Sequence, residues 1–356
     1  MPRLRRTNPG QPGITRRRRG RGFTYHDAKG RVVDDPEIRS RIDDLVIPPA
    51  WQQVWITPYA NGHLEAVGTD VAGRRQYMYH LDWQRNQGNL KHGRVLQLGA
   101  ALPKARSVVA EHLDQSGLTR ERVLATAFRL LDCGHFRIGG EVYAETNGSF
   151  GLSTLRREHV HRQGDELVFE YIAKSGLTRV ERIDDEILLD VVSSLRRRRG
   201  GDVDELLVYR DGKQWHRATS AEINAYVKDV LGLQISAKDF RTWHGTVLGA
   251  VAVADESLRH PKDTVWSKTA QDKAIRRAVV AVAENLGNTP TVCRGSYINP
   301  RVIELFREGV TIDRAVSRLQ RDRAGGKEPD QLDRDSLVTI GRAPTVERAV
   351  LKMLDD

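Results

Sequence analysis

Short runs of alternating apolar and polar residues fill the first quarter of the chain, and turn residues separate them, which is the pattern of β-strands. Asn61-Gly62 is a strong hairpin turn between the apolar runs at 54–56 and 64–67, and a third run follows at 76–80. We therefore predict a small β-rich domain over residues 22–93.

A helical period replaces this alternation after residue 93. Leu124, Ala127, Phe128 and Leu131 fall on one face of a predicted helix, and Gly134 supplies its stop. Further helix starts are predicted at Thr219, Ser236, Thr269, Thr289 and Asn299, the third helix ending at Gly287 and the last at Gly309. These signals predict a mainly helical domain over residues 94–310.

One β-hairpin interrupts the helical domain. The runs at 166–173 and 177–183 have strand character, and the turn Lys174-Ser175-Gly176 joins them, so Lys174 is expected near the hairpin tip. The fold class is thus α+β, with a small β-rich N-terminal domain and a larger, mainly α-helical domain. We expect residues 1–21 to form a disordered basic arm and residues 311–356 a polar C-terminal tail with a short helix from Thr345.

Composition narrows the classes of protein. The chain has 356 residues, enough for two domains, and it has neither a long apolar run nor an apolar signal segment at its N-terminus, so a cytoplasmic protein is expected. Its two cysteines, Cys133 and Cys293, lie far apart and have no neighbouring Cys for a disulfide framework or a zinc site. We interpret both as reduced core thiols.

The formal net charge of +10 points to a polyanionic partner. Most of it lies in the arm, which carries eight arginines and no acidic residue: Arg3, Arg5, Arg6, Arg16, Arg17, Arg18, Arg19 and Arg21. Such an arm can neutralise backbone phosphates without reading sequence, although a solubilising tail would have the same composition.

The larger domain contains an ordered series of residues suited to phosphoryl transfer without a metal. That chemistry requires cations for the phosphorane, an acid for the leaving oxygen and a nucleophile. The series consists of Arg137, Lys174, Arg241, Asn288 and Tyr297. Arginine suits the first task, because its planar guanidinium can donate to two phosphate oxygens and stays charged.

At these positions the sequence resembles the type IB DNA topoisomerases, in particular their poxvirus-like and bacterial branch. The segments that carry the resemblance are CGHFRIGGEVY, EYIAKSG, AKDFRTWHGT and GNTPTVCRGSYINP, together with IPPAWQQVWITP and GHLEAVGTDVAGRRQYMYH in the N-terminal domain. The match is collinear from about residue 22 to residue 309. It implies the catalytic fold shared by tyrosine recombinases and type IB topoisomerases.

The resemblance also implies catalytic roles. Tyr297 matches the nucleophile that forms a 3′-phosphotyrosyl bond and expels a 5′-hydroxyl, and Arg137 and Arg241 match the pair that clamps the non-bridging oxygens. Lys174 matches the lysine that protonates the leaving oxygen, with a plain hairpin-tip lysine as the alternative. Asn288 stands where many members have histidine, and a helix-capping role is its alternative.

An asparagine can still donate a hydrogen bond to a phosphate oxygen through its amide, but it adds no charge. We expect transition-state stabilisation to fall by about 1 kcal/mol, the difference between a neutral and a charge-assisted bond.

Further residues match DNA-contacting positions of the family: Gln76, Tyr77, Tyr79, Gly139, Tyr143 and Lys238. Gln can pair with adenine and aromatic rings can contact thymine methyl groups in the major groove. Burial of the two strand tyrosines against a core is equally compatible with their spacing, and Gly139 and Tyr143 are alternatively turn and packing residues. Lys238 would lie in the first turn of a helix whose free amides also favour phosphate.

The implied protein is a monomeric, nucleoid-associated type IB topoisomerase that relaxes duplex DNA as a two-domain clamp, opened by a linker near 88–93. No metal, ATP or small-molecule cofactor is expected, and no membrane. A tyrosine recombinase is the nearest alternative, but Lys238 stands where its usual His-x-x-Arg box has histidine, and the N-terminal domain is β-rich. An architectural DNA-binding protein leaves the catalytic series unexplained, and a metal-dependent nuclease lacks an Asp/Glu/His cluster.

Overall fold

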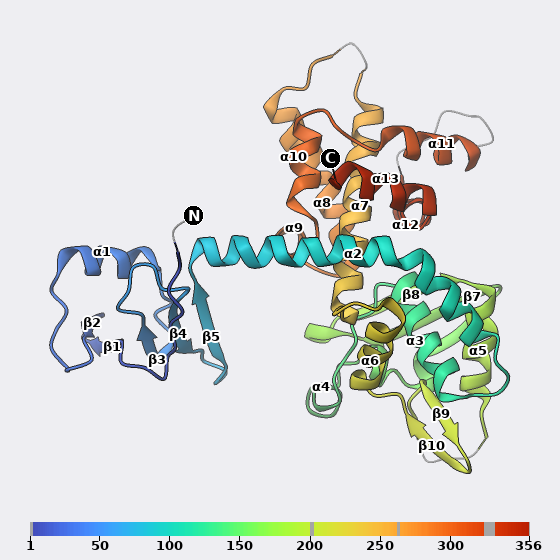
Figure 1. The fold of residues 1–356 in the computed structure, drawn as a ribbon, viewed down its shortest axis with the longest axis horizontal. Helices are drawn as coiled ribbons and strands as arrows, with labels where there is room; N and C mark the ends of the chain where they lie inside the picture. The colour runs from blue at the N-terminus through green and yellow to red at the C-terminus, as the bar shows by residue number, and fades with distance from the viewer. Residues whose placement is uncertain (1–2, 200–202, 262–263, 324–331, 356) are drawn as a thin grey trace. The chain divides into compact units, whose positions relative to one another are not determined.

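The computed structural model describes residues 3–199, 203–261, 264–323 and 332–355 (Figure 1). Contacts divide the chain into two units, residues 1–91 and residues 92–356.

The N-terminal unit is built on a five-stranded antiparallel sheet in the order β2-β1-β3-β4-β5. Its elements are β1 (Ile14–Arg19), β2 (Gly22–His26), α1 (Pro36–Asp44), β3 (Gln52–Ile56), β4 (Leu64–Thr69) and β5 (Arg75–Tyr79). Ile42 of α1 packs in one buried cluster with strand residues such as Ile14, Val54 and Ile56. The predicted hairpin at Asn61-Gly62 is confirmed as the β3–β4 connection.

Residues 3–21 differ from the expected disordered arm. β1 pairs with β2 from Thr15 opposite His26 to Arg19 opposite Gly22, so Gly20 and Arg21 form a two-residue turn, with Gly20 at φ 56°. Ile14 is buried, and the Arg16 guanidinium donates to the carbonyls of Ile47, Pro48 and Trp51. One buried apolar side chain and three hydrogen bonds therefore hold the first residues of β1 in the sheet.

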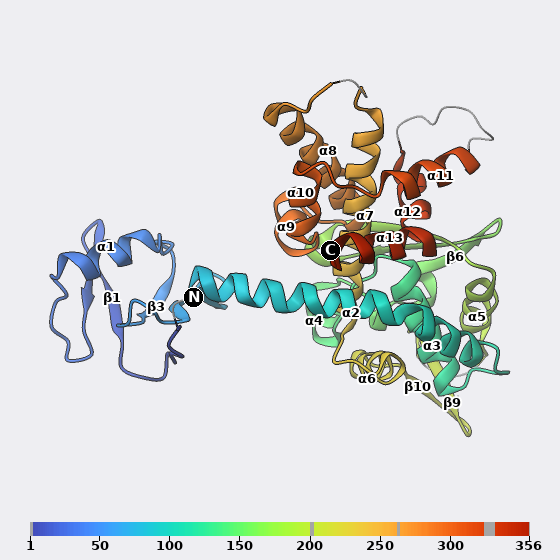
Figure 2. The ribbon, with the colours of Figure 1, turned by 45° about the horizontal axis from the view of Figure 1, so that its top comes forward.

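The linker expected near residues 88–93 lies instead inside α2 (Leu81–Leu113), a helix of 33 residues that is continuous in Figure 2. Gly88 and Gly93 lie within this helix, and a glycine there costs only about 1 kcal/mol relative to alanine. The buried residues of α2 begin at Val95 and recur at helical spacing to Leu113.

The second unit is mainly helical and is organised around α7 (Ala237–Arg259), whose residues are buried from Asp239 to Glu256. The other helices of residues 114–310 are α3 (Arg120–Cys133), α4 (Glu141–Asn147), α5 (Glu186–Arg197), α6 (Ser220–Leu231), α8 (Lys268–Leu286), α9 (Pro290–Ser296) and α10 (Pro300–Arg307). α8 and α10 both pack on α7. The predicted division into a β-rich part and a mainly helical part is confirmed.

Two small antiparallel sheets belong to this unit. One contains β6 (Val160–Gln163), β7 (Glu166–Ile172) and β8 (Thr178–Asp184) in that order, and the other contains β9 (Val208–Asp211) and β10 (Gln214–Arg217). β7 and β8 form the predicted hairpin, with Lys174 in the 3₁₀ turn at its tip.

Most predicted helix ends are also confirmed. Thr219 and Ser236 cap α6 and α7, and Gly287 ends α8 in the left-handed conformation with φ 60°. The predicted start of α8 at Thr269 is wrong, because the side chain of Ser267 accepts the capping bond from the Ala270 amide.

The short helix predicted from Thr345 is present as α13 (Pro344–Asp355), but the C-terminal region is not otherwise the expected polar tail. It also contains α11 (Asp313–Arg323) and α12 (Arg334–Gly341), and all three helices pack on α7. Glu347 of α13 accepts from both terminal nitrogens of Arg106 at 2.6 and 2.8 Å and from the Trp243 indole at 3.3 Å. The second turn of α7, where Trp243 lies, is thus tied to α13 and, through Arg106, to α2.

The described residues hold no group of acidic, His and Cys side chains arranged to bind a metal ion. Their helices include none long and apolar enough to cross a membrane. Both cysteines are free, and burial raises the pKa of Cys133 to about 12 and that of Cys293 to about 11, in agreement with core thiols.

Candidate active site

The residues of the candidate site gather around the C-terminal end of α8. The carbonyls of residues 284–287 all accept hydrogen bonds from arginine side chains that come from distant parts of the chain. Arg179 donates to Glu284 at 3.2 Å and to Asn285, Arg241 donates to Leu286 at 2.6 Å, and Arg137 donates to Gly287 at 2.9 Å. Since the last carbonyls of a helix have no partner within it and carry partial negative charge, they attract cations.

Arg241 enters from the first turns of α7 and is 2% exposed. Besides Leu286, its guanidinium donates to the carbonyl of His135, and its Nε has no hydrogen-bond partner among the described residues. Burial and, after it, the positive charge of Arg137 lower the pKa of Arg241 to about 10, and contact with Tyr297 opposes this shift. The side chain is therefore a buried cation at neutral pH.

Arg137 lies in the extended segment between α3 and α4. Its Nη2 donates to the Asn288 Oδ1 at 2.7 Å as well as to Gly287, and its own carbonyl accepts from the Leu152 amide at 2.8 Å. The segment continues to Gly139, whose φ of 83° favours glycine and whose Cβ position would lie 2.9 Å from the Cα of Gly151. The close packing of these two backbone segments thus fixes the position of the Arg137 Cα, from which the side chain extends.

Asn288 follows Gly287 directly and makes two different contributions. Its Oδ1 accepts from Arg137, whereas its Nδ2 is buried without a hydrogen-bond partner among the described residues. A buried donor without a partner is costly, so a ligand that accepts from it would be favoured. The alternative of a helix-capping role for Asn288 is wrong, because its Oδ1 accepts from Arg137 and the side chain of Thr289 caps α9.

Tyr297 ends α9 and lies beside Arg241. The Arg241 Cζ is 5.3 Å from the centroid of the half-buried Tyr297 ring. The backbone of Tyr297 is held twice, because its amide donates to Cys293 at 2.9 Å and its carbonyl accepts from the Thr246 hydroxyl at 3.3 Å. A Cβ on Gly245 would come within 2.8 Å of the Tyr297 carbonyl oxygen and 2.9 Å of its Cβ, so this glycine lets Tyr297 approach α7.

Lys174 is the one predicted catalytic residue that the structure does not bring to the others. It is exposed at the tip of the β7–β8 hairpin, and no contact joins it to Arg137, Arg241, Asn288 or Tyr297 in the described part of the chain. The remaining four residues converge around the end of α8. Two guanidinium groups, one amide and one phenol in this arrangement are chemically suited to hold a phosphate group beside the phenol oxygen.

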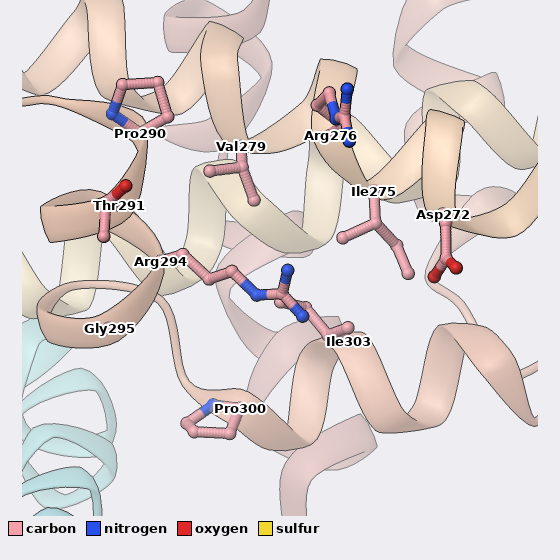
Figure 3. A pocket seen from close by; sticks show the side chains of 10 residues that line it. All are labelled: Asp272, Ile275, Arg276, Val279, Pro290, Thr291, Arg294, Gly295, Pro300 and Ile303. Carbon is pink, nitrogen blue, oxygen red and sulfur yellow. The ribbon is translucent and has the colours of Figure 1, made fainter.

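A separate groove of about 780 Å³ lies between α8, α9 and α10 (Figure 3). Its lining is largely apolar, with Ile275, Val279 and Ile303 among its residues, and Arg294 extends across it from α9. Tyr297, Arg137 and Arg241 do not line it, so this groove is distinct from the candidate site.

Comparison with known proteins identifies the family. Residues 81–320 match the family described as "Eukaryotic DNA topoisomerase I, catalytic core", and residues 22–70 match "Bacterial DNA topoisomerase IB, N-terminal domain". The chain belongs to the type IB DNA topoisomerases. It is 28% identical over 301 residues to the DNA topoisomerase 1B of Acanthamoeba polyphaga mimivirus, covering 83% of this chain and 88% of that protein. The DNA topoisomerase I of Monkeypox virus is 22% identical over 289 residues, 79% of this chain and 83% of the viral enzyme.

The tyrosines expected to face DNA in this topoisomerase are exposed on β5. Tyr77 and Tyr79 are 49% and 36% exposed and stack with ring centroids 6.3 Å apart, so the alternative that they pack into a core is wrong. Gln76 donates to the Asp70 carboxylate at 2.9 Å, which orients its amide. Contact of these residues with DNA stays a prediction.

The other predicted DNA-contacting residues lie in the second unit. Lys238 is exposed in the first turn of α7, three residues before Arg241. The φ of 83° and the close approach of Gly151 explain a glycine at position 139, and its contact with DNA stays a prediction. Tyr143 falls within α4, and its side chain lies outside the described residues.

Arg179 is the residue of this arrangement that the sequence analysis missed. Along β8 the buried positions are Arg179, Glu181 and Ile183, while Val180 between them is 38% exposed. The alternation of the sequence could have shown this, because Ile183 marks the inward face and the two charged residues share it at a period of two. A buried ion pair on the inward face of a strand is a signal for a structured polar site.

We predict that Gly245→Ala lowers plasmid relaxation by this topoisomerase roughly 10- to 100-fold, because the added methyl displaces Tyr297 from Arg241 and a shift of about 1 Å can cost that much. Gly295→Ala is the matched control, since a Cβ there meets nothing within 4 Å. Initial rates of relaxation of folded protein test this. Equal rates for the two variants would show that the close approach at Gly245 does not position Tyr297.

Proposed function

We propose that this topoisomerase relaxes supercoiled duplex DNA by transient cleavage of one strand through a covalent bond between Tyr297 and a 3′-phosphate. The observation that carries the proposal is the convergence of Arg137, Arg241, Asn288 and Tyr297 at the end of α8. A phosphate bound there would meet two guanidinium groups and one unpartnered amide donor beside a phenol.

In the proposed cleavage step the Tyr297 Oη attacks the phosphorus and the bond from phosphorus to the 5′-oxygen breaks. The phenol loses its proton, and the leaving 5′-oxygen gains one. Arg137 and Arg241 donate to the non-bridging oxygens and stabilise the charge that develops on the phosphorane. Arg241 has a particular position in this step, because it lies beside both the ring of Tyr297 and the end of α8.

Lys174 is proposed as the acid that protonates the leaving 5′-oxygen. Its place at the exposed tip of the β7–β8 hairpin leaves the ammonium group accessible to a bound DNA strand. The hairpin is also linked to the rest of the site, because β8 carries Arg179, which contacts the end of α8.

Religation is the reverse of this step. The free 5′-hydroxyl attacks the phosphotyrosyl bond and Tyr297 leaves, so one phosphodiester is exchanged for another of similar energy. The reaction therefore needs no ATP, and cations from the protein take the place of a metal ion. Strand rotation between the two steps releases torsion in the duplex. We propose duplex DNA as the substrate and partner of this enzyme, which acts as a cytoplasmic monomer.

A tyrosine recombinase could use a similar set of side chains, but the match of residues 22–70 to a bacterial topoisomerase IB N-terminal domain favours relaxation. The exposed tyrosines on β5 support a DNA-facing role for that domain. Recombination would require synapsis of two duplexes, whereas relaxation requires one.

The β1–β2 hairpin is proposed as an additional phosphate contact of this enzyme. Its exposed arginines lie on β1 and in the two-residue turn that follows it, and they are Arg17, Arg18, Arg19 and Arg21. None of the four is paired with an acidic residue in the described part of the chain. The pairing with β2 orders these cations in advance, so less conformational entropy is lost on binding than from a disordered arm.

We predict that Tyr297→Phe abolishes relaxation of both negatively and positively supercoiled plasmid, measured in EDTA without ATP, because the phenylalanine ring has no nucleophilic oxygen. The variant should also form no protein–DNA adduct that survives detergent. Relaxation by this variant at the unsubstituted rate would disprove the proposed mechanism.

We predict that Asn288→His raises the rate of strand cleavage about fivefold, because a histidinium donates a charge-assisted bond stronger by about 1 kcal/mol. The gain should be largest below the ordinary histidine pKa of about 6.5 and fade above it, since the neutral ring adds no charge. Asn288→Ala should lower the rate, because it removes both the donor and the acceptor for Arg137. A pH series of single-turnover cleavage tests both. No change in either variant would contradict a role for Asn288 in the reaction.

We predict that Arg17→Gln, Arg19→Gln and Arg21→Gln combined weaken DNA binding and lower the slope of log affinity against log salt by about two to three, as expected when that many phosphate contacts are lost. A control with the same net charge is Arg31→Gln, Arg314→Gln and Arg318→Gln combined, at exposed positions away from the turn. Binding titrations across a salt series measure the slopes. Equal slopes for the two triple variants would show that charge, and not the hairpin, determines binding.

A further inference from the structure

Arg179 is a buried arginine that the reaction proposed above does not use. It lies on β8, five residues after Lys174, and is 9% exposed. An arginine is rarely buried unless its charge is paired and its donors are satisfied. The contacts of Arg179 therefore indicate what it does.

Its guanidinium joins β8 to the end of α8. Nη1 donates to the Glu284 carbonyl at 3.2 Å and Nη2 donates to the Asn285 carbonyl. A Cβ on Gly287 would lie 2.8 Å from Nη1, so the guanidinium also lies directly against the residue that precedes Asn288. Arg179 thus donates to two residues of the last turn of α8, and the two residues to which Arg137 donates follow after one intervening residue.

The third nitrogen of Arg179, Nε, connects it through Glu181 to the segment that contains His135. Nε donates to Glu181 Oε1 at 2.6 Å, and Glu181 Oε2 lies 3.7 Å from His135 Nδ1. Burial by itself would raise the pKa of the Glu181 carboxyl, but His135 and Arg179 lower it to about 2, so the carboxylate stays ionised. The carbonyl of His135 accepts from Arg241, and Arg137 follows two residues later.

We propose that Arg179 is a positioning residue for phosphoryl transfer, which, through its ion pair with Glu181, holds the end of α8 and the His135 segment at a fixed separation. Arg137, Arg241 and Asn288 are each anchored to one or both of these two backbone segments. A change in their separation would therefore misalign all three groups relative to one phosphate. Arg179 itself does not contact the DNA in this proposal, which rests on the function proposed above.

The test compares Arg179→Met, Arg179→Lys and Glu181→Gln with the control Arg182→Gln. Arg182 is the next arginine on the same strand, but it is exposed, and the hydrogen bonds of its side chain among the described residues go to exposed Gln163 and half-buried Glu166. Single-turnover cleavage is measured with saturating enzyme on a short duplex that cannot religate. We expect Arg179→Met and Glu181→Gln to lower the cleavage rate constant about 100-fold, the effect of a misplacement of about 1 Å. Arg182→Gln should stay within about twofold.

Two readouts separate positioning from stability alone. A purely structural role would lower the fraction of enzyme that reacts, whereas positioning lowers the rate constant of the folded fraction and leaves DNA affinity unchanged. Arg179→Lys should recover part of the rate, because the ammonium can pair with Glu181 but cannot donate in a planar fork to two carbonyls. This variant and Glu181→Gln keep the test decisive if Arg179→Met does not fold.

A substrate with sulfur in place of the bridging 5′-oxygen distinguishes a defect in the clamp from a defect in the proton donor, Lys174. A thiolate leaves without protonation, so this substrate should restore cleavage by Lys174→Ala but leave the Arg179 variants slow, because their loss lies in the arginine clamp. Full restoration of the Arg179 variants by sulfur would overturn the proposal and assign the defect to Lys174.

Hydrogen exchange gives a readout that does not depend on catalysis. The amides of Gly287 and Asn288 donate to Glu284 and Ala283 at 3.2 and 2.9 Å, and they should exchange faster in Arg179→Met than in Arg182→Gln. Wild-type rate constants and unchanged exchange in the Arg179 variants would overturn the proposal. A covalent protein–DNA adduct that still forms in Tyr297→Phe would instead overturn the proposed function. The hydrogen-exchange result would still decide whether Arg179 anchors α8.

Discussion

The structure of the site depends on the attraction between the C-terminal carbonyls of α8 and three guanidinium groups. Arg137, Arg179 and Arg241 would repel one another if brought together in an apolar interior. The partial negative charge at the end of a helix, together with the Glu181 carboxylate, compensates this repulsion and supplies hydrogen-bond acceptors. The three cations are therefore held close together by groups of the protein itself.

The anchoring bonds do not use all of the donors. An arginine has five N–H groups, and Arg137 makes its described bonds through Nη2 alone. Arg241 keeps an Nε without a hydrogen-bond partner among the described residues, and Asn288 keeps an Nδ2 in the same condition. The same side chains can thus be fixed by protein carbonyls and still donate to phosphate oxygens. Preorganisation of this kind stabilises a transition state without reorganisation during the reaction.

Local signals of the sequence predicted much of the fold. The β7–β8 hairpin, the caps of α6 and α7 and the end of α8 at Gly287 follow from turn and capping residues that act over a few positions. The errors arose where tertiary contacts decide. Ile14 and the Arg16 hydrogen bonds order a segment whose composition suggested disorder, and Glu347 ties a polar C-terminal region to the core. The convergence of three chain segments, those of Arg137, Arg179 and Arg241, on the end of α8 has no local signature. Only the family resemblance could therefore group the predicted catalytic residues, and Arg179 was missed.

Identification of the residue that carries the covalent DNA is the most direct test of the central claim. The adduct is trapped on a cleavage substrate, digested with trypsin and analysed by mass spectrometry. The account predicts that the DNA is attached through its 3′-phosphate to the peptide of residues 295–301, GSYINPR, in which Tyr297 is the sole tyrosine. Attachment to another peptide, or through a 5′-phosphate, would contradict it.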